Sequence, residues 1–188
     1  MGLTRAGARP GDDIWVSGCV GGAWAALMHR WGKLTLDARV FPSAALAMDR
    51  PNPRNALGTA LLSSATACAD ISDGLAQDLG HILERSGVDA DVLWDAVPKH
   101  PALAALSQEQ QVEAAMSGGD DYELVFTAPA DKRGLIEQAS ISALTPVTRI
   151  GRIIEKKQSG APLAIRDASG RPLFLPVQGF DHFAQGAD

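Results

Sequence analysis

The stretch Asp70-Ile71-Ser72-Asp73-Gly74-Leu75 decides how this 188-residue chain is organised. A small, mostly apolar run, residues 65–69, precedes it, and after it apolar residues recur at the i, i+4, i+7 and i+8 positions of one helix face, at 75, 79, 82 and 83. We expect the helix to begin near Ser72 or Asp73, because both residue types cap helices well. Gly87 is placed to end it.

Two carboxylates, Asp70 and Asp73, therefore crowd the start of the predicted helix. The helix dipole and the unpaired N–H groups of a first turn favour anions such as phosphate, but these side chains would repel one. A phosphate ester could dock only with Mg²⁺ between the two sets of oxygens. The alternative is that Ser72 or Asp73 is only a cap and that Asp70 is an ordinary surface residue.

A second acidic motif, Ser117-Gly118-Gly119-Asp120-Asp121-Tyr122-Glu123, follows about forty residues later. Apolar and polar residues alternate through 122–127 with the period of a strand. The motif predicts a glycine turn that places two aspartates at the entrance of that strand. Taken alone, it is equally well explained by a hairpin or bulge turn.

Several separate motifs in this order resemble the C-terminal half of the thiamine-monophosphate kinase family. That family belongs to a superfamily that includes aminoimidazole ribonucleotide synthetase and selenophosphate synthetase. The resemblance covers residues 1 to about 183 and is carried by segments 5–12, 16–18, 50–54, 70–75, 78–82, 117–124 and 179–183.

The resemblance implies transfer of the ATP γ-phosphoryl group to thiamine monophosphate, which gives thiamine diphosphate. Both reactants are phosphate esters, so catalysis rests on alignment and charge neutralisation. No general base is needed, because a phosphate monoester is already largely deprotonated near neutral pH. The implied cofactors are Mg²⁺ and ATP, the latter as co-substrate.

The resemblance also assigns roles to six residues. It implies that Asp70 and Asp73 bind magnesium, that Arg5 and Ser72 contact ATP, and that Asp120 and Phe180 contact the thiamine substrate. The chain departs from the family at two positions: Asp120 stands where the family usually has Glu, and Gly22 where it usually has Asp.

The implied fold class is α/β, as the C-terminal domain of the aminoimidazole ribonucleotide synthetase-like fold, with a mixed sheet packed by helices. We expect one domain over residues 1–183 and a frayed tail at 184–188. The family's N-terminal ATP-binding domain has no counterpart before Arg5, so we expect an N-terminal domain or a homodimer partner and no useful activity from these residues alone. Two alternatives remain: a non-catalytic Mg-nucleotide-binding or regulatory module, and another ATP-dependent member of the superfamily.

Composition and charge limit the classes of partner and the location that we expect for this chain. The net charge of −5 and the lack of a basic stripe argue against nucleic-acid binding, and no apolar run is long enough for a membrane span. Cys19 and Cys68 lie in small apolar settings that suit a reduced, cytoplasmic protein. The four histidines are scattered, which gives a zinc site little support. We expect His81 to be a structural or surface residue.

Periodicity predicts an alternating order of strands and helices. Strands are expected at 14–16, 90–94, 123–127, 150–154, 163–166 and 173–175. Helices are expected at 23–31, 43–48, 132–140 and in the centre of 101–116. Residues 57–68 predict either an alanine-rich helix or a helix followed by a strand that ends at 71.

Overall fold

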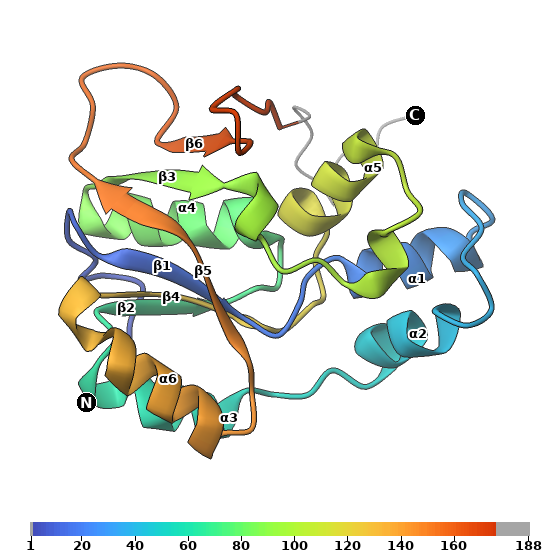
Figure 1. Cartoon of the computed structure of the whole chain (residues 1–188), viewed down its shortest axis with the longest axis horizontal. Coiled ribbons are helices and arrows are strands. Elements are labelled where there is room, and N and C mark those ends of the chain that lie inside the picture. The colour runs from blue at the N-terminus through green and yellow to red at the C-terminus, as the bar shows by residue number, and fades with distance from the viewer. Residues whose placement is uncertain (1, 176–188) are drawn as a thin grey trace, which may run out of the picture.

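A computed structural model of the chain, which describes residues 2–175, is built around a six-stranded mixed sheet with the order β2-β4-β1-β5-β3-β6 (Figure 1). Neighbouring strands are antiparallel except β3 and β6, which are parallel. The strands are β1 (Asp13–Ser17), β2 (Ala67–Asp70), β3 (Asp89–Leu93), β4 (Leu124–Ala128), β5 (Val147–Ile154) and β6 (Leu163–Arg166). A mixed sheet packed with helices is the predicted fold class.

Helices connect and cover these strands. The described residues form α1 (Gly22–Arg30), α2 (Phe41–Asp49), α3 (Asn55–Ala60), α4 (Leu75–Ser86), α5 (Gln108–Val112) and α6 (Arg133–Ser142). Five shorter turns accompany them: η1 (Leu61–Ser63), η2 (Trp94–Ala96), η3 (Pro101–Leu103), the π-helical η4 (Glu113–Ser117) and η5 (Ala130–Lys132). Within residues 2–175, no helix combines the length and the apolar character that crossing a bilayer requires.

The centre of the sheet, at β1 and β4, is buried on both faces. Ile14 and Val16 belong to the larger apolar cluster, which also contains the apolar face of α4. Trp15, between them, points to the opposite face, where it stacks on Phe126 and joins residues of α3 and α6. Figure 1 shows α3 and α6 together, with α4 apart from them. Burial on both faces explains why β1 and β4 read as short, nearly continuous apolar runs.

Most predicted elements are present, and the differences have local causes. The segment 57–68 follows the second alternative, because α3 ends at Ala60 and β2 begins at Ala67. The predicted strand at 173–175 is wrong: Pro172 forms only an isolated bridge with Arg166, and proline cannot donate to a longer ladder. Strand β5 is longer than expected and begins at Val147, because it pairs along its length with β1 and β3.

Candidate functional site

The turn between β2 and α4 is built differently from the sequence prediction. The N-cap of α4 is Gly74, with φ 112°, and no side chain caps the helix start. Instead Asp78, fully buried in the first turn of α4, reaches back, and its Oδ2 accepts the backbone N–H groups of Ser72 (2.9 Å) and Asp73 (3.0 Å). The prediction that Ser72 or Asp73 caps the helix is therefore wrong.

This arrangement changes what the turn can offer to a ligand. The N–H groups of Ser72 and Asp73, which the sequence argument made available to a phosphate, are already bound by Asp78. Burial, as the largest effect, raises the pKa of Asp78, and the two N–H donors oppose that shift. The side chains of Ser72 and Asp73 are released from capping, and the Asp73 side chain is exposed.

The two acidic motifs are hydrogen-bonded to each other. The N–H of Asp120 donates to the carbonyl of Ser72 (3.0 Å), and the N–H of Tyr122 donates to the carbonyl of Ile71 (2.9 Å). The N–H of Ile71 in turn donates to the carbonyl of Glu123 (2.8 Å). These bonds continue the antiparallel pairing of β2 with β4 beyond the strands. Residues about fifty positions apart in sequence thus form one surface.

Glycine permits this close approach. A Cβ at Gly119 would lie 2.4 Å from the carbonyl oxygen of Ser72, which is closer than real side chains come. A Cβ at Gly74 would lie 2.9 Å from the carbonyl oxygen of Met116, and the φ of Gly74 is itself unfavourable for other residues. Gly74 and Gly119 therefore allow the backbones of the two motifs to lie in close contact.

The second motif alternates between exposed and buried side chains. Asp120 and Tyr122 are exposed, with φ of 65° and 50°, and Asp121 and Glu123 are buried. A positive φ costs about 1–2 kcal/mol at a residue other than glycine. The buried members of the motif must hold this conformation in place.

Asp121 and Glu123 supply that anchorage. The Asp121 carboxylate accepts the N–H of Gly21, at the start of α1 (2.8 Å), and burial raises its pKa to about 7. Glu123 accepts bonds from the Arg54 guanidinium, including Nε at 2.7 Å, and from the Ser17 hydroxyl. The motif is thereby fixed to α1, to β1 and to the segment before α3.

Three exposed carboxylates share the resulting surface. Asp120 accepts a bond from the Tyr122 hydroxyl (3.4 Å), and the pKa of Tyr122 is raised first by the charge of Asp120 and further by those of Asp70 and Asp73. The charges of all three side chains therefore raise the pKa of the same hydroxyl group. Clustered, exposed carboxylate oxygens are the ligands that a hard cation such as Mg²⁺ prefers, so the residues present fit that ion.

Arg5 lies beside this surface, where a guanidinium nitrogen is 3.7 Å from Asp70 Oδ1. Both residues line a groove of about 940 Å³, together with Tyr122 and the apolar side chains of Leu3 and Leu62. A groove with apolar walls and a few charged groups has the usual features of a small-molecule binding site. The structure thus brings Arg5, the Asp70–Asp73 turn and Asp120 to one region. The predicted substrate contact Phe180 lies outside the described residues.

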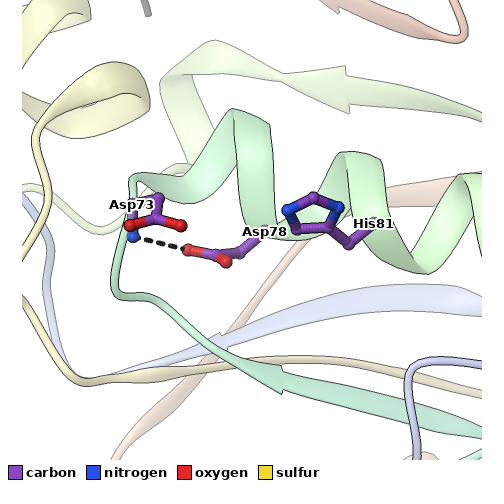
Figure 2. A group of neighbouring side chains, drawn as sticks. All are labelled: Asp73, Asp78 and His81. Carbon is purple, nitrogen blue, oxygen red and sulfur yellow. Dashed lines mark hydrogen bonds between the residues drawn. The ribbon is translucent and has the colours of Figure 1, made fainter. Parts of the chain in front are cut away.

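The first turns of α4 bring together residues that the sequence reasoning did not combine. One potential ligand atom each from Asp73, Asp78 and His81 lies within 4.8 Å of the others (Figure 2). His81 is half-buried beside these two carboxylates, and its expected role as a structural or surface residue stays a prediction. The available signal was the 78–82 motif, in which Asp78 and His81 are three residues apart and share a helix face.

At Gly22 the structure leaves little room for the aspartate that the family usually carries. A Cβ there would lie 2.9 Å from the imidazole ring of His100. The ring is held by a bond from the N–H of Ala102 to His100 Nδ1. A side chain at position 22 would require this ring to move.

Comparison with known proteins identifies the family. The model for "AIR synthase related protein, C-terminal domain" matches residues 9–163, most of the chain. The chain belongs to this family. The resemblance inferred from the motifs is thereby confirmed at the level of the superfamily.

Curated relatives of this AIR synthase related chain are thiamine-monophosphate kinases. That of Salmonella typhimurium is 40% identical over 187 residues, covering 97% of this chain and 55% of the relative. That of Escherichia coli K12 is 39% identical over 184 residues, again covering 97% and 55%. The chain therefore spans about half the length of the curated relatives it matches.

Solved structures of thiamine-monophosphate kinases are also similar to most of this chain. The thiamine-monophosphate kinase from Stenotrophomonas maltophilia K279a has a TM-score of 0.79 and 42% identity, over 87% of this chain and 52% of that one. AaThiL complexed with AMPPCP and TMP has a TM-score of 0.72 and 27% identity, over 91% and 52%. The hydrogenase maturation protein HypE of E. coli, at 18% identity and a TM-score of 0.67 over 94% of this chain and 53% of that one, shows the shared fold alone.

Proposed function

We propose that these residues form part of a thiamine-monophosphate kinase that transfers the γ-phosphoryl group of ATP to thiamine monophosphate. The observation that carries the proposal is the hydrogen-bonded junction of the two acidic motifs, which gathers Asp70, Asp73 and Asp120 beside Arg5. The AaThiL structure, which contains AMPPCP and TMP, supports the pair of substrates. Because the chain spans about half of its relatives, the activity is proposed for the complete protein.

Arg5 and Ser72 are the proposed contacts to ATP. The Arg5 guanidinium is about half exposed at the groove and makes only a long ion pair with Asp70, so it is free to turn toward phosphate oxygens. The Ser72 hydroxyl, relieved of a capping role, can donate to the same phosphates. Both contacts would align the donor with the acceptor, which is the main requirement of phosphoryl transfer.

Asp70 and Asp73 are the proposed magnesium ligands. When bound, Mg²⁺ would neutralise the negative charge of the phosphate oxygens. The chain keeps Asp70 at the end of β2 and Asp73 in the adjoining turn, and Asp78 fixes the backbone of that turn. A rigid turn holds the exposed carboxylates in place before the ligands arrive, which lowers the entropic cost of binding.

Asp120 is the proposed contact to thiamine monophosphate, with Phe180 as a second contact. The positive φ of Asp120 and the buried anchors Asp121 and Glu123 fix the direction of its short side chain. Asp120 has one methylene fewer than the usual Glu, so its carboxylate reaches less far. The backbone at Asp120 therefore has to lie closer to the substrate for the contact to form.

The remaining parts of the proposal concern the whole protein. An N-terminal domain or a homodimer partner would complete the site, and residues 1–188 alone would form no useful amount of thiamine diphosphate. One domain over 1–183 and a tail at 184–188 remain the proposed division. The proposed location is the cytoplasm, where the free thiols of Cys19 and Cys68 would stay reduced.

Thermal unfolding with ligands tests the proposed binding site. We expect Mg²⁺ with AMPPCP to raise the melting temperature of residues 1–188 more than either alone, because cation and phosphate charges are neutralised together. At 100 times Kd the gain is about 2.7 kcal/mol, or roughly 5–10 °C for a chain of this length. Asp73→Asn should remove the joint effect, whereas Asp131→Asn, at an exposed position in η5, should keep it. Equal melting temperatures with and without the ligands would count against the site.

A further inference from the structure

The strands β5, β3 and β6 form the half of the sheet that lies away from the candidate site. On one side of the sheet, α3 and α6 pack against β1 and β4, and Figure 1 shows both helices at a distance from β3 and β6. On that same side, β5, β3 and β6 carry exposed side chains, whereas their other side is buried in the larger apolar cluster. This half of the sheet therefore has one face open to a partner.

A β-bulge in β5 brings two arginines to the open face. In the pairing with β1, Ile150 is an extra residue between Arg149 and Gly151, each of which has a partner on β1. Side chains alternate along a regular strand, so residues 149 and 152 would otherwise point to opposite faces. With the bulge, Arg149 and Arg152 are both exposed, and Ile150 is buried in the larger apolar cluster.

The two arginines line a groove of about 400 Å³ together with Arg166 at the end of β6. The exposed apolar side chain of Leu93 and the turn at 167–170 contribute to the same groove. This volume lies within the range that small-molecule binding sites occupy. Three guanidinium groups thus border one space of the size of a small ligand.

These guanidinium groups are only weakly engaged within the protein. Among residues 2–175, Arg152 forms no ion pair. Arg149 lies 3.3 Å from Asp13, a carboxylate that an arginine of α6 already binds through both oxygens at 2.6 and 2.9 Å. Arg166 donates to Asp91 at 3.2 Å, and both of these side chains are about half exposed. Most of their N–H donors therefore remain available to a ligand.

The acidic residues of the groove do not cancel this charge. Asp167 is turned into its own loop, where it accepts the backbone N–H groups of Ser169 and Arg171, each at 2.9 Å. Asp91, which lies opposite Arg152 on the neighbouring strand, is the other carboxylate that lines the groove. Three arginines therefore face one available carboxylate, although the net charge of the whole chain is −5.

We propose that this groove binds the diphosphate group of a small molecule. A planar guanidinium group donates two parallel N–H bonds to phosphate oxygens, which makes arginine well suited to this anion. Leu93 offers apolar surface to an organic group attached to the diphosphate. The groove is separate from the candidate site, because β2, which carries Asp70, and β6 lie at opposite edges of the sheet. Its role as an anion site does not depend on the proposed kinase activity.

Titration of residues 1–188 with inorganic pyrophosphate, followed through the backbone amide resonances, tests the site. Mg²⁺ is left out, because the carboxylates of the candidate site then repel the anion. We expect saturable shifts of the amides at 149–152 and 166–170. Arg152→Gln should weaken this binding about fivefold, whereas Asp91→Asn should strengthen it by a similar factor, because a competing carboxylate is removed.

Two control variants make the same charge changes outside the groove. Arg39 and Asp37 form an exposed pair before α2, so Arg39→Gln and Asp37→Asn should bind pyrophosphate as the wild type does. Arg152 is exposed and forms no ion pair among the described residues, so its variant should stay folded, which the amide spectrum itself reports.

A second titration, with ADP in place of pyrophosphate, distinguishes the two sources of a diphosphate group. Tighter binding of ADP at the same amides would assign the groove to a phosphate ester, and equal or weaker binding would assign it to the inorganic anion. The proposal is overturned if pyrophosphate shifts none of these amides, if a folded Arg152→Gln binds as the wild type does, or if Arg39→Gln weakens binding equally. The proposed kinase function would survive each of these results, because its residues lie outside the groove.

Discussion

Replacing Arg54 by Ala removes the only cation that pairs with the buried Glu123 among the described residues. Arg54 donates through Nε to one carboxylate oxygen (2.7 Å) and through a second guanidinium nitrogen to the other. The Glu123 side chain is 7% exposed and that of Arg54 is 19% exposed. After the substitution, the Ser17 hydroxyl is the remaining side-chain donor to a buried charge.

The expected loss follows from that unpaired charge. Breaking a buried ion pair from one side costs about 3–5 kcal/mol, and the partial exposure of Arg54 places this pair near 3 kcal/mol. For a chain of this length, such a loss lowers the melting temperature by roughly 6–12 °C. The loss should also loosen the strained Asp120 segment, because Glu123 is one of its anchors.

Calorimetry and urea unfolding at neutral pH measure the loss, with Arg39→Ala as the matched control. Arg39 also pairs with a carboxylate, Asp37, but its side chain is 87% exposed. An exposed pair contributes about 0–1 kcal/mol, so this control should lose little. If Arg54→Ala lost no more stability than Arg39→Ala, Glu123 would not depend on its partner and the anchoring argument would fail.

Two further predictions concern the same junction. Gly119→Ala should destabilise the protein by more than about 2 kcal/mol, because the new Cβ would lie 2.4 Å from the Ser72 carbonyl oxygen. Gly80→Ala is the matched control, because Gly80 lies in the interior of α4 and a Cβ there would meet nothing within 4 Å. This substitution should stabilise the protein by about 0.5–1 kcal/mol. Urea unfolding compares the two, and a similar effect of both substitutions would contradict the close approach. Burial raises the pKa of Asp121 from 3.8 to about 7. Between about pH 4 and 7, the Asp121 carboxyl is therefore protonated in the folded protein and ionised in the unfolded chain. The stability of the folded protein that depends on this group decreases as the pH rises. Relative to wild type, Asp121→Asn should therefore become more stable from about pH 4 to 7, and a wild type that gains on the variant over this range would refute the assignment.

Much of the fold was predictable because the strands carry apolar runs and turn residues mark their ends. The start of α4 was not. Capping rules look for an oxygen at the N-cap, whereas here Asp78 reaches back from within the helix to the N–H groups of Ser72 and Asp73. Gly74, the N-cap, has a positive φ in the turn between these residues. Local sequence preference predicts a side-chain cap at Ser72 or Asp73, whereas in the folded chain Asp78 binds the N–H groups of both residues.

Part of the candidate site could likewise be predicted from the sequence, and part could not. Its acidic residues stand out in the sequence because Asp and Gly cluster there, but the anchors Asp121 and Glu123 could not be assigned, since their partners Gly21 and Arg54 are 100 and 69 residues away. The scattered histidines argued against a zinc site, and His81 was expected to be a structural or surface residue. Helix periodicity alone could have placed His81 beside Asp78, but only the structure shows that Asp78 Oδ1 lacks a partner.

The most direct test of the central claim is thiamine diphosphate formation by a chimera in which residues 1–188 replace the matching segment of the Salmonella typhimurium relative. The proposed function predicts product from the folded chimera and a loss of at least about 100-fold with Asp73→Asn, because an amide is a poor magnesium ligand. Asp131→Asn should leave the rate unchanged. A folded chimera that forms no product, or an Asp73→Asn chimera that keeps the parent rate at limiting Mg²⁺, would contradict the claim.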